Sequence, residues 1–383
     1  MDRRHGAESI SGIGGGKMVS RESERNLNIA RDLCQRRKPY EALPYLQKAL
    51  KDPRNIDAGI ELAFLAPNKK ECVKILEESA DRGKEILLKD WLGPDAFDDD
   101  GPHVGRFWGL LETRPYMRAL SALGRMYFET EEYAKSTATY IEMLRLNPGD
   151  NQGVRTSVGS SLIRDGRYAD ALYFAQKWLE NSLGSGMPMA RGGTDFGEPS
   201  KTLYTPEVEG KLSECWNGEM IHTAALASFK LLGDCDLSRQ YLKIAAKVTP
   251  YILLRVLGKI TRPTELNMIP RSPNSPEEAH DYLWLSQDLW MEEDVWNWAD
   301  NNPDAKQVIL KNCSNEVQGC RTREGEVAQF KRCSACRLVS YCSVSCQKAH
   351  WSQHKAACKE HQALKASAKA FARPGKPPKK SGK

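Results

Sequence analysis

The sequence lacks long apolar runs, and this absence argues against a membrane-spanning helix. No stretch of the 383 residues approaches the roughly 18 consecutive apolar residues that a spanning helix needs. The first twenty residues are polar and do not contain the apolar core of a secretory signal. We therefore expect a soluble intracellular protein in the cytoplasm, the nucleus or both, without a membrane partner.

Acidic residues are missing from the last twenty residues, which carry seven cations and no Asp or Glu. The net charge of the whole chain is +6 at pH 7, so without these seven cations the rest carries −1. A near-neutral body gives no reason to expect nucleic acid, although a basic tail can bind it without sequence specificity. We expect the tail to be a solubilising end or a localisation signal. A transcription-linked nucleic-acid-binding factor remains an alternative.

Cysteine is scarce over most of the chain and dense near its end. Seven of the eleven cysteines lie between Cys313 and Cys358. A secreted domain stabilised by disulfides is short and rich in cysteine throughout. A single dense cluster at the end of a long chain favours metal binding instead.

Residues 27–311 carry the apolar spacing of helices, and few segments alternate as strands do. Residues 120–150 and 156–180 resemble one another at a shift of 35 residues, which places Gly124 on Gly159. Each copy predicts two helices joined by a short turn. The period and pattern resemble the tetratricopeptide repeat of about 34 residues. That resemblance implies that the small residue lets the two helices of a repeat approach closely.

Four tryptophans fall within residues 281–298: Trp284, Trp290, Trp296 and Trp298. One interpretation is a helix whose aromatic face packs on the helices before it. The other is an exposed aromatic docking patch. We favour the packed helix.

The dense segment offers eight candidate zinc ligands, which are Cys313, Cys320, Cys333, Cys336, Cys342, Cys346, His354 and Cys358. Structural zinc takes four Cys or His ligands in a tetrahedron. Eight ligands therefore predict two closed sites and two Zn2+ ions per chain, with no position left for a catalytic water. His350 follows Cys346 by four residues and is an alternative to His354.

The segment resembles the MYND-type zinc finger through Cys333-x2-Cys336, Tyr341-Cys342, Cys346-Gln347, Trp351, His354 and Cys358. The resemblance implies two interleaved sites, one of Cys313, Cys320, Cys342 and Cys346 and the other of Cys333, Cys336, His354 and Cys358. The family usually places two residues within its first cysteine pair, whereas six stand between Cys313 and Cys320 here.

The same resemblance implies a groove for proline-containing peptides, formed by Ser334, Gln347 and Trp351. Gln347 and Trp351 lie four residues apart on a helix. We expect their stripe to be offset by about 100° from the zinc ligands, so that both side chains face away from the metal. The alternative is that Trp351 packs on the zinc core.

These features predict a mostly α protein in which a tetratricopeptide-like array is followed by a two-zinc finger. The predicted parts are a disordered leader at 1–22, a helical repeat domain at 23–302, a linker at 303–312, the MYND-type finger at 313–358 and a basic disordered tail at 359–383. The module of about 46 residues has few large apolar side chains, so its folding should depend on zinc.

The predicted function is a zinc-binding scaffold for protein–protein interactions. Its finger would bind proline-containing peptides, and its helical repeats would bind a second protein. MYND fingers also occur beside SET methyltransferase domains, so a protein methyltransferase is the enzymatic alternative. No segment has the β-rich, glycine-punctuated pattern of such a domain, and we therefore expect no enzyme. The oligomeric state stays open.

Overall fold

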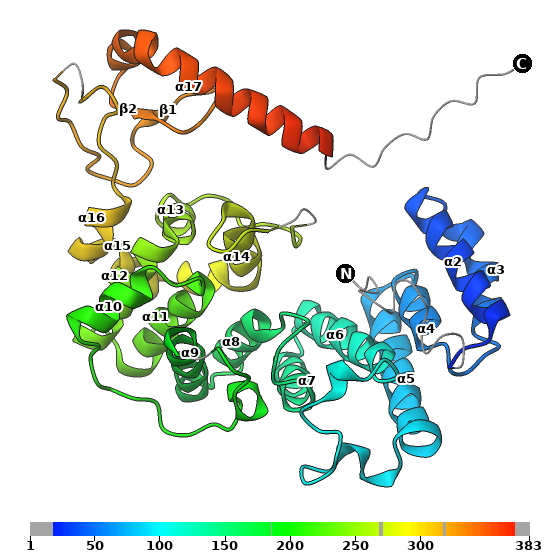
Figure 1. Ribbon diagram of the computed structural model, residues 1–383. Coiled ribbons are helices and arrows are strands. Elements are labelled where there is room, and N and C mark those ends of the chain that lie inside the picture. The colour runs from blue at the N-terminus through cyan, green and yellow to red at the C-terminus, as the bar shows by residue number, and fades with distance from the viewer. Residues whose placement is uncertain (1–17, 185, 268–270, 317–318, 372–383) are drawn as a thin grey trace, which may run out of the picture. The chain divides into compact units, whose positions relative to one another are not determined.

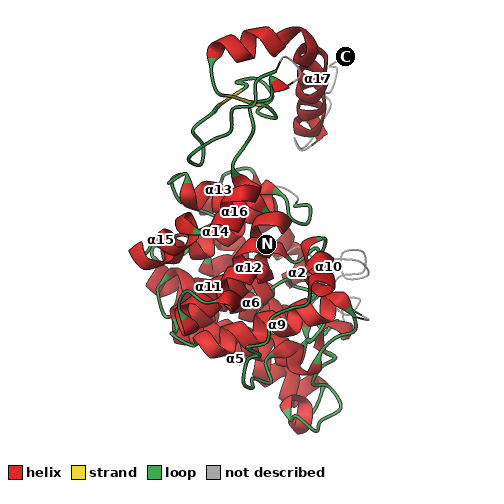
Figure 2. Cartoon of the chain, turned by 90° about the vertical axis from the view of Figure 1, so that its left-hand side faces the viewer, coloured by secondary structure: helices red, strands yellow, loops and turns green. Residues whose placement is uncertain are grey.

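The computed structural model describes residues 18–184, 186–267, 271–316 and 319–371, with side chains through residue 367. Helices dominate the described chain, and its strands, β1 (Lys331–Arg332) and β2 (Ser340–Tyr341), pair antiparallel (Figure 2). The predicted mostly α fold with a small cysteine-rich module near the C-terminus is therefore confirmed. In the described residues, no helix combines the length and apolar character that crossing a bilayer requires.

The chain divides between Lys201 and Thr202 into two compact units, where we predicted one helical domain over 23–302. In the first unit, helices pack mainly on their neighbours in sequence (Figure 1). Its α-helices are α2 (Arg21–Gln35), α3 (Pro39–Ala49), α4 (Ile56–Ala63), α5 (Lys69–Ile86), α6 (Arg114–Glu129), α7 (Tyr133–Leu146), α8 (Arg155–Arg164) and α9 (Tyr168–Leu183). Short helical turns are η2 (Leu87–Trp91), η3 (Pro94–Phe97), η4 (Phe107–Gly109) and η5 (Ala190–Gly193).

The two similar segments each form a pair of helices, as predicted: α6 with α7, and α8 with α9. Close approach within the first pair depends on Gly124. A Cβ atom at this position would lie 2.8 Å from Cε1 of Tyr140, whose buried ring fills the space between α6 and α7. Membership of these pairs in the tetratricopeptide family stays a prediction.

The start of the first unit differs from the predicted leader at 1–22. Ser20 caps α2, because its side chain accepts a hydrogen bond from the backbone N–H of Ser23. Just before it, Met18 and Val19 are buried, with Trp91 packed against them. The predicted leader is therefore structured from residue 18, and residues 1–17 lie outside the described part.

The second unit contains the remaining helices and the cysteine-rich module. Its helices are α10 (Pro206–Ser213), α11 (Gly218–Leu232), α12 (Asp236–Val248), α13 (Pro250–Leu257), α14 (Pro276–Trp290), α15 (Glu293–Asn301), α16 (Pro303–Ile309) and α17 (Val344–Phe371). Two predicted boundaries differ from the structure. The predicted linker at 303–312 is largely α16, which packs on α12, and α17 continues through residues 359–371 of the predicted tail.

The tryptophan-rich segment forms two helices, α14 and α15, and its aromatic side chains enter the core. Trp290 is completely buried, and Trp298 stacks on Phe229 with ring centroids 4.4 Å apart. The half-buried Trp296 donates its indole N–H to the carbonyl oxygen of Val256. Core packing is therefore confirmed over the exposed docking patch.

Candidate metal centre

A hairpin-like arrangement of the chain brings Cys313 beside Cys320. The backbone N–H of Cys313 donates to the carbonyl oxygen of Thr322 at 2.9 Å. The backbone N–H of Glu324 donates to the carbonyl oxygen of Lys311, also at 2.9 Å. An antiparallel bridge between Asn312 and Arg323 lies between these bonds. The two flanking segments therefore run side by side, which closes the six-residue interval between the cysteines.

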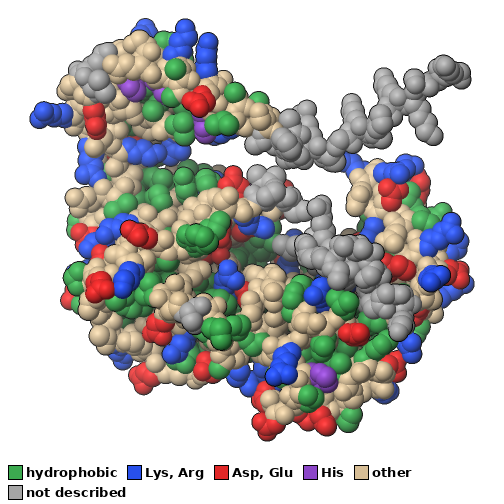
Figure 3. All heavy atoms as spheres, in the orientation of Figure 1, with side chains coloured by type: hydrophobic (Ala, Val, Ile, Leu, Met, Phe, Trp, Pro, Cys, Tyr) green, Lys and Arg blue, Asp and Glu red, His purple; other side chains and the backbone are tan. Residues whose placement is uncertain are grey.

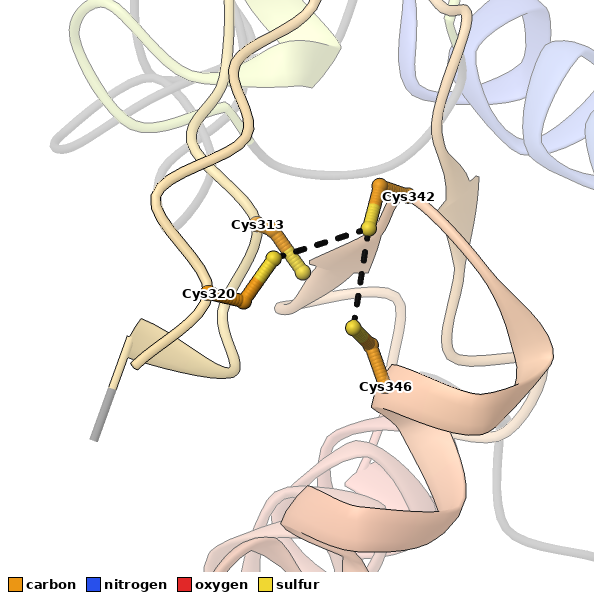
Figure 4. Close-up of side chains that lie close together, drawn as sticks. All are labelled: Cys313, Cys320, Cys342 and Cys346. Carbon is orange, nitrogen blue, oxygen red and sulfur yellow. Dashed lines mark hydrogen bonds between the residues drawn. The ribbon is translucent and has the colours of Figure 1, made fainter. Parts of the chain in front are cut away.

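Cys342 and Cys346 complete a first group of four sulfurs (Figure 4). Cys342 directly follows β2, and Cys346 lies in the first turn of α17. The Sγ atom of Cys342 is 3.7 Å from that of Cys320 and 3.6 Å from that of Cys346. All four Sγ atoms lie within 4.8 Å of one another.

The second group joins a tight turn to the middle of α17. In the turn, the N–H of Arg337 donates to the carbonyl of Cys333 at 2.9 Å, which places Cys333 and Cys336 side by side. His354 and Cys358 are one helical turn apart on α17. The two Sγ atoms of Cys333 and Cys358 are 3.9 Å apart, and Cys336 Sγ is 3.3 Å from Nε2 of His354. All four side chains are buried.

The distances between these donor atoms fit tetrahedral zinc. A Zn–S bond of about 2.3 Å separates two sulfurs of one tetrahedron by about 3.8 Å. The three Sγ–Sγ distances given above range from 3.6 to 3.9 Å. None of the eleven cysteines forms a disulfide. Each group is thus a closed set of four ligands of the types that structural zinc prefers.

The structure distinguishes between the two candidate histidines. His354 is buried and lies in the second group. His350 is half-buried, and its Nδ1 atom is 3.0 Å from the hydroxyl of Tyr341. His350 therefore lies beside the metal centre and holds Tyr341, while His354 supplies the ligand atom.

The protonation of the first group shows why it needs a cation. Hydrogen bonds from the side chain and backbone of Thr322 lower the pKa of Cys320 to about 6. Burial and the neighbouring sulfurs, chiefly that of Cys346, raise the pKa of Cys342 to about 12. Cys320 thus deprotonates easily, whereas deprotonation of Cys342 beside it is unfavourable. A zinc ion removes this opposition, because it binds thiolates and displaces their protons.

Neighbouring N–H groups orient the sulfurs of the second group. The side-chain amide of Gln362 donates to Sγ of Cys358 at 3.2 Å, and the backbone N–H of Leu338 donates to Sγ of Cys336 at 3.4 Å. Such bonds stabilise the thiolate form and fix the direction of the ligand. Gln362 follows Cys358 by one turn of α17, so the i, i+4 spacing in the sequence itself places this amide beside the ligand.

The three predicted peptide-binding residues all lie at or near the surface of the finger. Ser334 is exposed, Gln347 is half-buried and the side chain of Trp351 is 42% exposed. Trp351 does not face away from the metal as expected, because its ring contacts His354 with centroids 6.0 Å apart. The i, i+3 spacing of these two residues indicates such a contact. A role of the three residues in peptide binding stays a prediction.

Comparisons with known proteins identify the module. The family model for the MYND finger matches residues 311–358. The SET domain and MYND-type zinc finger protein 6 of Schizosaccharomyces pombe is 40% identical over 73 residues, which covers 17% of this chain and 15% of that protein. The SET domain-containing protein 14 of Caenorhabditis elegans is 54% identical over 33 residues, which covers 9% of this chain and 8% of that protein.

The chain spans no more than 15% of the length of either relative. No solved structure matches it. The likeness to these two relatives therefore concerns the cysteine-rich module. Residues 311–358 of this chain are a MYND-type zinc finger, and its two ligand groups are the sites of two zinc ions.

Proposed function

We propose that this protein is a non-enzymatic scaffold whose MYND finger binds a proline-containing peptide at Trp351. MYND fingers are protein-interaction modules, which gives the chain a zinc-binding role in protein interactions. The observation that carries the finer proposal is the 42% exposure of the Trp351 indole on a helix fixed by ligands of both zinc sites. A flat aromatic surface held rigidly suits the rings of an extended proline-rich segment.

The ligand sets support a structural role for the metal. Each zinc ion would have four protein ligands, so neither has an open position for a substrate or a reactive water. The finger would contribute a shaped surface, and the metal would hold that surface in place.

A hollow on the second unit supports a separate partner for the helices. It has a volume of about 710 Å3, and its lining includes Gln240 and Lys243 of α12 and Asn297 and Asn301 of α15. At this hollow the side-chain amide of Gln240 pairs with the backbone of Tyr204. Its Oε1 accepts from the N–H of Tyr204 at 2.8 Å, and its Nε2 donates to the carbonyl of the same residue at 2.9 Å. We propose that this hollow binds an extended segment of a second protein.

The names of the two relatives favour one alternative, a protein methyltransferase. Their matches cover only the finger region. A transfer assay with labelled S-adenosylmethionine and a mixture of candidate proteins tests this alternative. Incorporation of label above that of a heat-denatured sample would overturn the non-enzymatic proposal.

The peptide-binding proposal is tested by affinity capture with immobilised proline-rich peptides. The intact chain should bind, and the Trp351→Ala variant should not. Trp216→Ala is a matched control, because Trp216 lies outside the finger and its side chain is 77% exposed. Equal capture of all three proteins, or capture of none, would contradict the proposal.

A further inference from the structure

Two lysines on the exposed part of α17, Lys348 and Lys355, lack the acidic partners that several helical lysines have elsewhere in the chain. On helices of the two units, such pairs form within one turn at 2.6–2.8 Å, as in Lys38–Glu41, Lys135–Glu132 and Lys211–Glu207. The positions three and four residues away from Lys348 and Lys355 contain no carboxylate. Among the described residues, neither lysine forms an ion pair.

These two lysines flank the exposed indole of Trp351. Lys348 precedes it by three residues and Lys355 follows it by four, so all three side chains lie on neighbouring positions of one helix surface. Both lysines are exposed. Lys359 follows Lys355 by four residues, a like-charge spacing that weakens a helix slightly. Local helix stability therefore does not account for this arrangement.

The positive charge extends over the whole module. Residues 311–367 contain ten Lys and Arg against four Asp and Glu. Two zinc ions bound by seven thiolates change this balance by −3, and the net charge stays positive. Figure 3 shows Lys and Arg side chains projecting from this part of the chain, with few acidic side chains among them. A partner that brings carboxylates to this surface would be attracted to it.

We propose that the peptide recognised at Trp351 is acidic as well as proline-containing, with carboxylates that pair with Lys348 and Lys355. This inference rests on the proposed peptide-binding role of the finger. Along the helix axis the two lysines are about 10 Å apart, at about 1.5 Å per residue. An extended proline-rich segment rises about 3.1 Å per residue. A peptide running along α17 matches the lysines when its acidic residues are three or four positions apart and bracket the proline.

A different use of the lysines would be to neutralise the anionic zinc centres. The observed hydrogen bonds favour the peptide instead. The N–H donors to the second-site sulfurs include the side chain of Gln362 and the backbone of Leu338, and within the described chain no lysine ammonium is seen to donate to a ligand sulfur. Lys348 and Lys355 are directed at solvent, where a partner can reach them.

The test uses the full-length, zinc-loaded protein and fluorescence anisotropy with three labelled probes. The first is a neutral peptide with a Pro-Pro core, and the second is the same peptide with glutamates bracketing the prolines. The third is a single-stranded oligothymidine of twelve nucleotides. The acidic peptide should bind about threefold to tenfold more tightly than the neutral one at low salt, as two exposed ion pairs provide. High salt should reduce this advantage by screening.

Charge reversal then locates the effect. Lys348→Glu and Lys355→Glu should each reduce the advantage of the acidic peptide, while binding of the neutral peptide and the zinc content stay unchanged. Lys365→Glu is the matched control, because it makes the same change on the same helix about 21 Å from Trp351. The Lys365→Glu variant should still bind the acidic peptide more tightly than the neutral one.

Each contrary outcome has its own meaning. Equal binding of both peptides would overturn the acidic preference and leave the peptide-binding function standing. Binding of neither peptide would overturn the function itself. Tighter binding of the oligonucleotide, dependent on the same lysines, would replace the peptide with nucleic acid. Loss of zinc from the Lys348 or Lys355 variants would assign these lysines to the metal centre and overturn the inference.

Discussion

The indole of Trp351 meets the imidazole of His354 edge to face, with centroids 6.0 Å apart and planes at 68°. One aromatic side chain thus covers a zinc ligand while 42% of it remains exposed. Contact with His354 and exposure to solvent can be separated by experiment, because the site that contains His354 has three further ligands, all cysteines, that do not depend on the tryptophan for their identity. Trp351 is therefore a neighbour of the metal site and is not one of its ligands.

Replacing Trp351 by Ala should leave two zinc ions per chain and weaken the second site alone. Loss of a group that orients a ligand typically costs about 10–100-fold in metal affinity. Competition with a chromophoric chelator should show one ion leaving more easily and the other unchanged. Complete loss of zinc from this variant would mean that Trp351 is part of the core of the finger.

The structure also makes Cys313 a full member of the first site, because it is completely buried beside Cys320, Cys342 and Cys346. Cys313→Ser should therefore bind one zinc ion, and Cys333→Ser should lose the other one. Elemental analysis of purified protein measures both, with Cys235→Ser outside the finger as the control. Two zinc ions in Cys313→Ser would remove this residue from the ligand set.

Sequence spacing predicted the ligands because metal coordination requires particular atoms at short intervals along the chain. Spacing did not show how Cys313 reaches its site, since the hydrogen bond between Cys313 and Thr322 forms across an interval of irregular length. The direction of Trp351 was missed for another reason. At about 100° per residue, Trp351 and His354 lie only about 60° apart around the helix axis, so the expected offset between the tryptophan and the zinc ligands was wrong and the two rings are neighbours.

The sequence likewise predicted some helix boundaries and missed others. The turns between α6 and α7 and between α8 and α9 were predicted because polar residues interrupt the apolar spacing there. The helix α16 was missed because it is short and begins with Asn302-Pro303, which we interpreted as the start of a linker. Asn302 in fact caps α16 by accepting from the N–H of Ala305, and burial of Ile309 anchors the helix.

Zinc removal should unfold the finger and leave most of the helical signal. The cluster around the ligands includes Phe330 and Tyr341 but otherwise consists mainly of cysteines, so little apolar surface stabilises it without metal. Circular dichroism before and after chelation should show a small loss that zinc restores. Cooperative loss of the whole helical signal would mean that the finger and the helices fold as one unit.

A buried ion pair should contribute to the stability of the first unit. Asp57 on α4 is fully buried and accepts two hydrogen bonds from Arg118 on α6, at 2.8 and 2.9 Å. Asp57→Ala leaves a buried guanidinium without its carboxylate, a change that costs about 3–5 kcal/mol. Chemical denaturation followed by circular dichroism measures this. The exposed pair Glu85–Lys89 is the control, and Glu85→Ala should have little effect.

His222 should make the second unit less stable in acid. Its side chain is completely buried, and Nδ1 donates to the carbonyl of Gly218 at 2.8 Å. Its Nε2 has no hydrogen-bond partner among the described residues. A proton on Nε2 would be buried without an acceptor. Burial accordingly lowers the pKa of His222 to about 4 in the folded protein, from 6.5.

The sign of this effect follows from proton binding. Below pH 6.5 the unfolded chain takes up a proton at His222 that the folded chain does not, so the free energy of unfolding falls as the pH drops toward 4. The contribution that is lost reaches about 3 kcal/mol at pH 4. His222→Phe removes this titration and keeps an aromatic ring beside Tyr282 and Trp290. Urea denaturation of both proteins between pH 4 and 7 should therefore give a steeper pH dependence for the original chain. The two proteins differ only at residue 222, so the contributions of all other groups cancel in the difference. Parallel curves would show that His222 is protonated as readily in the folded state as in the unfolded one.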